Sequence, residues 1–139
     1  MIILDTNAVS ETMKPAPSES VLRWLASQNP LSIFITVITQ AEILYGIELM
    51  AVGRRRQRLA HAAEGVFSED FKDRILPFDQ PSAREFARIL TGRNAAGRPM
   101  SQFDAMIAAI ARLHRATLAT RNISDFEDCD IRLINPWDG

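Results

Sequence analysis

Four acidic side chains occupy positions where an apolar run ends or a helical pattern begins. Asp5 directly follows MIIL at the start of the chain, and Glu42 lies within the stretch ITVITQAEIL. Asp104 lies within SQFDAMIAAIA, and Asp125 lies within LATRNISDF. Four carboxylates in one cleft would raise one another's pKa, and a hard divalent cation such as Mg²⁺ or Mn²⁺ resolves that conflict. Two such ions about 3.5–4 Å apart can activate water and stabilise the leaving oxygen of a phosphodiester.

The sequence around these acids predicts alternating strands and helices, because short apolar runs alternate with segments of helical period. The predicted strands are Ile2–Leu4, Ser32–Thr36, Ile75–Phe78, Thr117–Ala119 and Ile131–Ile134. The predicted helices are Ala8–Met13, Ser18–Ser27, Gln40–Val52, Gln57–Gly65, Pro81–Arg93 and Gln102–Arg115. This alternation is typical of an α/β fold in which helices cover both faces of a mainly parallel sheet, here of about five strands. We expect one such domain over residues 1–139.

The predicted topology brings the four acids to one edge of the sheet. In an open parallel sheet, ligands bind beyond the carboxyl ends of the strands, where the strand order reverses. A purely structural interpretation is also available, since TQAE and SQFD fit the capping-box pattern for Glu42 and Asp104, and Asp125 suits a turn. Asp5 is harder to explain in this way, because neither a cap nor a turn is required directly after MIIL.

Composition restricts the alternatives. The 139 residues are 47% hydrophobic and 24% charged, as expected for a globular domain, and the net charge is −1. Cys129 is the only cysteine, which excludes an internal disulfide, and with His61 and His114 it offers no zinc-ligand spacing. The sequence shows no apolar run long enough for a membrane span and no signal peptide, so we expect a cytoplasmic protein.

Five short motifs together resemble the PIN-domain nucleases, specifically the VapC/FitB-type toxins of toxin–antitoxin pairs. They are LDTN at the start, TQAE, FDAMIAAIA, ATRN-x-x-DF after the fourth strand, and INPW near the end. The resemblance covers the whole chain. It implies a PIN-like three-layer α/β/α fold and an endoribonuclease that uses Mg²⁺ or Mn²⁺ to cut single-stranded or structured RNA. It also implies a homodimer neutralised by a small antitoxin, with promoter DNA bound through the antitoxin.

The resemblance assigns residues to the site. Asp5, Glu42 and Asp104 match the three acids of the family site, and we expect them to hold the metal ion. The fourth acid is assigned to Asp125, which would position a second ion or the attacking water, with Asn122 supplying an amide. Thr6, Asn7 and Thr120 match family positions that orient the site.

All basic residues except Lys14 and Lys72 are arginine, a side chain that suits phosphate contacts. Arg98 and Arg121 are the preferred RNA contacts because they lie close in sequence to the proposed acids. The cluster RRRQR (residues 54–58) is the densest, but a charge run is usually a solvated helix face. Arg98 falls in TGRNAAGRP (residues 91–99), which two glycines and a proline predict to be a loop.

Three other functions are weaker alternatives. An aspartyl-phosphate phosphatase needs a second Asp two residues after the first, and this chain has Asn7 there. A non-catalytic, carboxylate-lined binding module that acts through its partner stays open on sequence grounds. So does structure-specific cleavage of DNA, because the metal chemistry does not depend on the sugar.

Overall fold

The structure, a computed structural model, describes residues 1–138 and is built around a five-stranded sheet. All strand pairs are parallel, and the strand order is β3-β2-β1-β4-β5. The strands are β1 (Ile2–Leu4), β2 (Ile33–Thr36), β3 (Ile75–Leu76), β4 (Thr117–Ala119) and β5 (Arg132–Ile134). The predicted parallel α/β sheet is confirmed, with β3 ending two residues earlier than expected.

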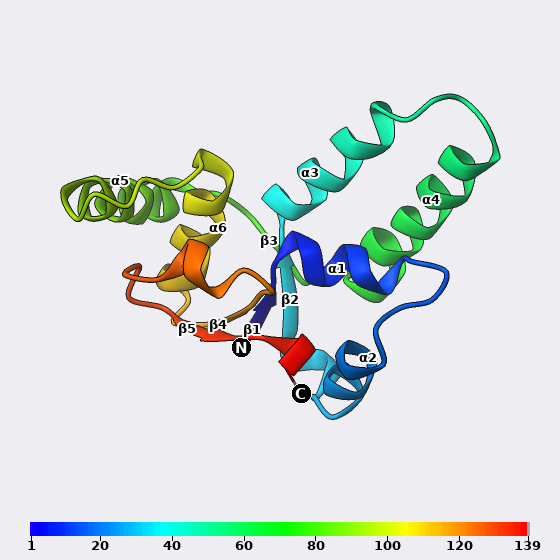
Figure 1. Cartoon of the computed structure of the whole chain (residues 1–139), viewed down its shortest axis with the longest axis horizontal. Helices are drawn as coiled ribbons and strands as arrows, with labels where there is room; N and C mark the ends of the chain where they lie inside the picture. Colours follow the sequence, from blue (N-terminus) through cyan, green and yellow to red (C-terminus); the bar gives the residue numbers. More distant parts are fainter. Residues whose placement is uncertain (139) are drawn as a thin grey trace.

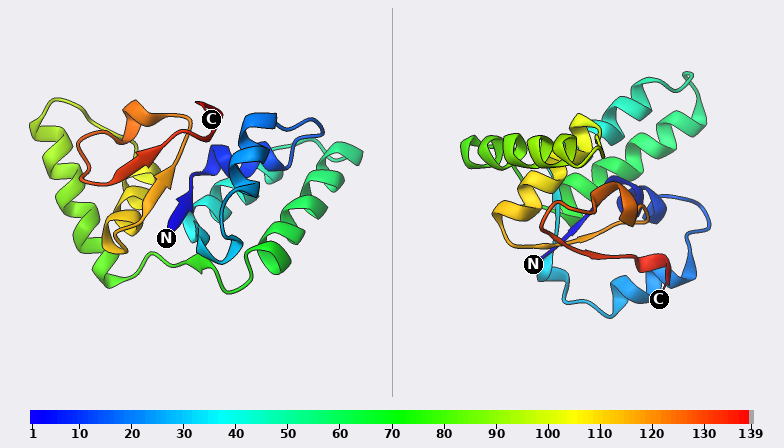
Figure 2. Two further views of the ribbon diagram at one scale, coloured as in Figure 1. Left: turned by 90° about the horizontal axis from the view of Figure 1, so that it is seen from below. Right: turned by 60° about the vertical axis from the view of Figure 1, so that its left-hand side comes forward.

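Helices cover both faces of this sheet, which gives the predicted three layers (Figure 1; Figure 2). They are α1 (Thr6–Thr12), α2 (Glu19–Ala26), α3 (Val37–Glu48), α4 (Arg54–Gly65), α5 (Gln80–Ala95) and α6 (Gln102–Leu113). Helices α5 and α6 lie on one face, and α1, α3 and α4 lie on the other. No helix described within residues 1–138 is both long and apolar enough to cross a lipid bilayer.

Alternating strand residues feed two separate core clusters. Ile3 and Leu118 point to one face, where they pack with Ile107 of α6. Leu4 and its neighbours on the opposite face pack with Ile43 of α3. Because successive strand side chains point to opposite faces, a strand buried on both sides must be apolar throughout, as MIIL is.

Helices α1 and α3 begin two and three residues earlier than predicted. Helix α1 starts at Thr6, so Asp5 is its N-cap, and the expectation that no cap is needed after MIIL is wrong. The N-cap of α3 is Thr36, whose hydroxyl oxygen accepts the N–H of Thr39 at 3.1 Å. The capping-box interpretation of Glu42 is therefore also wrong, because Thr39 lies inside the helix.

The predicted loop over residues 91–99 is wrong in its first half, since α5 continues through residue 95. The guanidinium of Arg93 is buried and donates to the carbonyl oxygens of Arg98 and Glu127, which holds this last turn in place. Gly97 then takes a left-handed conformation (φ 70°) that favours glycine and ends the helix. Tertiary contacts thus outweigh the weak helix preference of TGRNA.

Candidate active site

The candidate site lies where the strand order reverses. Strand β1 is central, with β2 on one side and β4 on the other, and a ligand crevice forms at such a point in parallel sheets. The register pairs Leu4 with Ala119, so the residues that follow them, Asp5 and Thr120, leave the sheet side by side. The carboxyl ends of β1 and β4 therefore lie next to each other, as predicted.

Asp5 is buried, with only 5% of its surface exposed. One carboxylate oxygen accepts the Thr6 backbone N–H at 2.9 Å. The other accepts the Thr120 hydroxyl at 2.8 Å and the Asn7 side-chain amide at 3.3 Å. Capping α1 needs only one of these oxygens, so the cap does not explain a carboxylate held on both sides by three donors.

Glu42 is half-buried and is held by a threonine relay rather than by a helix cap. Its carboxylate accepts the Thr6 hydroxyl at 2.7 Å. The same Thr6 oxygen lies 2.9 Å from the hydroxyl of Thr39, which is fully buried. A hydroxyl has one hydrogen to donate. Because Thr6 gives its hydrogen to Glu42, Thr39 is the donor to Thr6, and the order Thr39 to Thr6 to Glu42 is fixed.

Asp104 is half-buried in the first turn of α6, and its backbone N–H is capped by the Ser101 hydroxyl at 3.1 Å. Asp125 is exposed in a short helical turn (Ile123–Phe126) that begins after Asn122. The negative charge of Asp125 contributes to the raised pKa of Asp104, so the two carboxylates share one region. Asp125 is therefore the outermost of the four acids.

The pKa values of the inner three acids are all raised. Burial raises the pKa of Asp5 to about 6 against the opposing hydrogen bonds from Thr120 and Thr6, and the charges of Asp104 and Glu42 add to the rise. Burial also raises the pKa of Glu42 and of Asp104, with smaller contributions from neighbouring acids. Each carboxylate is thus ionised at a cost that a nearby cation would relieve.

The donor chemistry of this site suits a hard divalent cation. Every candidate ligand is a carboxylate oxygen, which Mg²⁺ and Mn²⁺ prefer and which gives zinc none of its usual nitrogen or sulfur partners. Across residues 1–138, however, no three acidic, His or Cys side chains already stand together as a closed metal-binding group. Asp5 and Glu42 are instead bonded to the threonine hydroxyls, which hold each of them in place.

Asn7, Thr120 and Asn122 connect the ends of β1 and β4. The Asn7 side-chain amide lies 3.4 Å from the Thr120 hydroxyl, which also accepts the Asn122 backbone N–H at 3.1 Å. The Asn7 side-chain oxygen accepts the Arg121 backbone N–H at 3.3 Å. These residues lie beside Asp5, and their contacts fix the geometry around it.

The two arginines predicted to contact RNA differ in their surroundings. The Arg121 guanidinium stacks over the Trp137 ring, 5.3 Å from its centre. Arg98 is already bound to Glu127 at 3.2 Å and to Asp128 at 2.8 Å. An RNA contact by Arg98 stays a prediction, and it would have to compete with these two carboxylates.

Sequence reasoning missed two buried residues near the site. The sequence indicated only a capping role for Thr39. Its place in the motif TQAE, three residues before Glu42, is the signal that could have indicated a role in the site. Arg93 is 4% exposed, and its charge slightly lowers the pKa of Asp104 against the larger effect of burial. Nothing in TGRNAAGRP indicated that this arginine would be buried.

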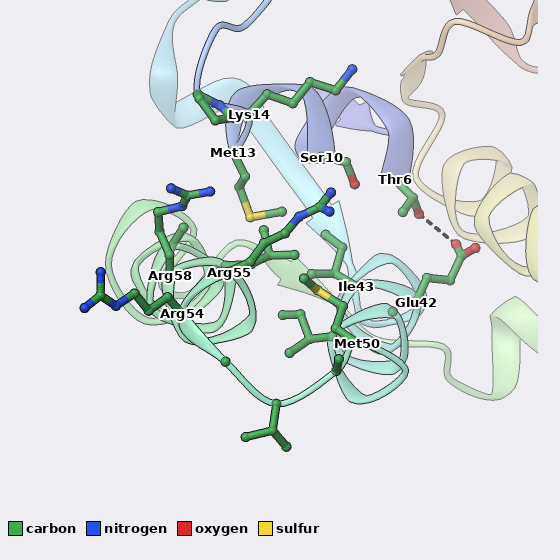
Figure 3. Close-up of a pocket in the computed structure, with 18 residues that line it drawn as sticks. Thr6, Ser10, Met13, Lys14, Glu42, Ile43, Met50, Arg54, Arg55 and Arg58 are labelled. Atoms are coloured by element: carbon green, nitrogen blue, oxygen red, sulfur yellow. Dashed lines mark hydrogen bonds between the residues drawn. The ribbon is translucent and has the colours of Figure 1, made fainter.

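A groove of about 940 Å³ adjoins the acids between α1 and the hairpin of α3 and α4 (Figure 3). Thr6 and Glu42 form one end of it. Its apolar walls include Met13, Ile43, Ile47, Met50 and Leu59, and its basic residues are Lys14, Arg54, Arg55 and Arg58. The groove therefore meets the acidic site at Glu42, which is the one acid of the four among its lining residues.

The fold and the site together define a class: three-layer parallel α/β proteins with a carboxylate-lined crevice at the switch point. Residues 2–131 match the PIN domain family. The chain is 37% identical over 137 residues to toxin FitB of Neisseria gonorrhoeae, covering 99% of both chains. The chain belongs to the PIN-domain family.

Two further comparisons agree with this membership. The chain is 36% identical over 138 residues to VapC ribonuclease Y4jK of Sinorhizobium fredii, again covering 99% of both chains. A solved structure of FitAB bound to an IR36 DNA fragment superposes with a TM-score of 0.91 at 37% identity, covering 99% of this chain and 96% of the other. Both similarities extend over the whole fold described above.

Proposed function

We propose that this PIN-domain protein is a divalent-metal-dependent endoribonuclease that acts as the toxin of a toxin–antitoxin pair. The observation that carries the proposal is the approach of three acids to one another at the switch point. Thr6 bonds to both Asp5 and Glu42, and the charge of Asp104 helps to raise the pKa of both. The names of the relatives, a toxin and a VapC ribonuclease, support the same function.

In this proposal Asp5, Glu42 and Asp104 hold Mg²⁺ or Mn²⁺. When bound, the ion supplies positive charge that stabilises the charge developing on a cleaved phosphodiester. The protein's own part is to fix the carboxylates in advance: Thr120 holds Asp5 and Thr6 holds Glu42. Preorganised oxygens need no rearrangement during the reaction.

Asp125 is exposed, and we place it at the outer edge of the proposed metal site. Its charge acts on Asp104, and in this proposal it positions a second ion or the attacking water. Arg121 is the neighbouring cation, and its stacking on Trp137 limits its motion at the rim. We assign Arg121 and the Asn122 amide to the RNA backbone on this side of the site.

The proposed partners are a small antitoxin, through which promoter DNA is bound, and a second copy of the chain. The solved FitAB structure bound to DNA supports the first, since it superposes on nearly the whole chain. Exposed apolar residues on α3, among them Leu44 and Tyr45, support a covered surface in the assembled protein.

Cleavage of RNA by the purified protein tests the proposed function. We expect single-stranded RNA to be cut in the presence of Mn²⁺ and EDTA to stop the reaction. Asp104→Asn should reduce the rate at least about a hundredfold, because several kcal/mol of charge stabilisation are lost. Asp130→Asn is the matched control, since it removes an exposed carboxylate at the amino end of β5, on the opposite edge of the sheet.

The same assay separates the other functions. Cleavage of a branched or single-stranded DNA but not of RNA would show that the substrate is wrong. Metal-independent cleavage that survives Asp104→Asn would show that the site is wrong. If the protein binds an antitoxin but cuts no nucleic acid, it is a non-catalytic binding module.

A further inference from the structure

The turn that carries Asp125 (Ile123–Phe126) has little internal structure to fix its position. It is a single short helical turn that lies beside α6 (Figure 1). Phe126 and, shortly after it, Cys129 are both 1% exposed and anchor this segment in the core. Asp125 itself lies on the exposed side of the turn. Its position therefore depends on contacts made across the surface of the turn.

Arg98 makes three contacts with this segment. Its guanidinium donates to the carbonyl oxygen of Ser124, the residue directly before Asp125, at 3.2 Å. It also binds the carboxylates of Glu127 at 3.2 Å and of Asp128 at 2.8 Å. A guanidinium is planar and holds its donors in a rigid fork. Three acceptors bound to one such fork therefore define the orientation of the turn on both sides of Asp125.

Arg98 is itself held in place by the buried Arg93. The Arg98 backbone N–H donates to the carbonyl oxygen of Arg93 at 2.9 Å, and the Arg93 guanidinium donates to the carbonyl oxygen of Arg98. Three residues farther along the chain, the Ser101 hydroxyl caps α6 by accepting the N–H of Asp104. Arg98 therefore joins the turn that carries Asp125 to the segment that leads into the helix of Asp104.

We propose that Arg98 is a positioning residue of the candidate active site, which holds Asp125 beside Asp104 through its contacts with the turn. The inference rests on the proposed ribonuclease function, in which Asp125 positions a second ion or the attacking water. The two acids are close enough for the charge of Asp125 to raise the pKa of Asp104. Their relative placement matters, because a displacement of about 1 Å near a reacting group can lower a rate about a hundredfold.

The surroundings of Arg98 favour this role over a direct contact with RNA. The guanidinium carries one positive charge, and the carboxylates of Glu127 and Asp128 that bind it carry two negative charges. The group of three therefore has a net negative charge, which repels a phosphate. A phosphate would also have to displace a carboxylate from a charge-assisted hydrogen bond that is already formed.

A double-mutant cycle in the RNA-cleavage assay tests this role. Asp125→Asn should lower kcat about a hundredfold. Arg98→Ala should lower kcat about tenfold, because Asp125 is still present but is held less firmly, and should change KM for RNA less than about twofold. In the Asp125→Asn background, Arg98→Ala should lower kcat less than about twofold further, because a residue that acts through Asp125 then has no carboxylate to position.

Hydrogen exchange in EDTA supplies a measurement that does not depend on activity or on a bound metal ion. Arg98→Ala should speed amide exchange from residue 122 to residue 128, because the turn opens more often without its outer contacts. Arg88→Ala is the matched control, since it removes an exposed arginine of α5 that is bound to Glu85 at 3.3 Å. It should leave kcat, KM and the exchange of the turn unchanged.

The outcomes separate this inference from the proposed function. If Arg98→Ala raises KM and its effect multiplies with that of Asp125→Asn, Arg98 contacts RNA and the positioning role is overturned. Unchanged exchange of the turn, or an Asp125→Asn protein with the kcat of the wild type, would also overturn it and leave the ribonuclease standing. If the wild-type protein cuts no RNA, the proposed function fails, whereas faster exchange in Arg98→Ala would still show that Arg98 holds the turn.

Discussion

At the scale of single residues, Asp5 has two roles that oppose each other. As the N-cap of α1 it accepts the Thr6 N–H, and as a buried carboxylate it carries a charge that burial disfavours. Its pKa of about 6 in the folded protein lies above the ordinary value of 3.8. Folding therefore favours the protonated form, and Asp5 makes the metal-free protein less stable as the pH rises from about 4 through about 6.

The first prediction concerns this cost. One pKa unit corresponds to about 1.4 kcal/mol, so the shift at Asp5 costs about 3 kcal/mol at neutral pH. Asp5→Asn removes the charge and keeps an oxygen for the Thr6 N–H, but its NH2 group replaces the oxygen that accepts from Thr120 and Asn7, which offsets part of the gain. In EDTA the variant should be about 1–3 kcal/mol more stable than the wild type at neutral pH and no more stable near pH 4. Urea denaturation at the two pH values measures this difference.

Metal addition supplies the control for Asp5. Mn²⁺ should stabilise the wild-type protein and leave Asp5→Asn nearly unchanged, because a ligand that binds only the folded state raises its stability. The comparison of the two proteins cancels the contribution of other acids, such as Glu11, whose pKa is lowered by its bonds to Lys14 and Ser18. A stability difference that does not depend on pH would contradict the assigned pKa shift.

At the scale of elements, Arg93 joins the end of α5 to the segments on either side of the site. Its carbonyl partners lie before α6, which carries Asp104, and after the turn that carries Asp125. Arg93→Met should lower the free energy of unfolding by about 2 kcal/mol, because two buried carbonyl oxygens lose a charged donor. Amide hydrogen exchange should become faster from residue 96 to residue 101.

Arg88→Met is the matched control on the same helix. Arg88 is exposed and pairs with Glu85 at 3.3 Å, a contact expected to contribute about 0–1 kcal/mol. Urea denaturation of both variants gives the comparison. Equal, small losses of stability in the two would show that Arg93 does not hold these segments together.

The same elements show what the sequence could and could not predict. Asp5 and Asp104 were placed correctly at a strand end and a helix start, because apolar strands and the amphipathic pattern of α6 are local signals. The start of α1 was missed because no cap was expected at Asp5, and the start of α3 was missed because Thr36 and Thr39 are both suitable caps. Element boundaries depend on such choices more than element type does.

Contacts between distant segments carried no local signal at all. The bond from Thr6 to Glu42 joins positions 36 residues apart, and the bond from Thr120 to Asp5 joins positions 115 apart. The family motifs could indicate that these residues belong to one site, but spacing could not say which hydroxyl holds which acid. That assignment required the sheet register that pairs β1 with β4.

At the scale of the whole molecule, α3 is apolar on more sides than a surface helix needs. Ile43 and Ile47 are buried against the sheet and the neighbouring helices. On its outer side Tyr45 is 65% exposed and Leu44 is 47% exposed. A helix with one partner layer normally keeps a polar outer face. The outer face of α3 therefore suits burial against another chain.

The last prediction follows from this face. The expected homodimer should be weakened by Tyr45→Asp, because a charge would have to be buried in an apolar interface. Sedimentation velocity should show a concentration-dependent dimer for the wild type and a monomer for the variant. Leu31→Asp is the control, since Leu31 is 72% exposed and lies in the turn before β2, away from α3. The opposite result would contradict this prediction. If Tyr45→Asp sediments like the wild type and Leu31→Asp sediments as a monomer, the interface lies near Leu31 and not on α3.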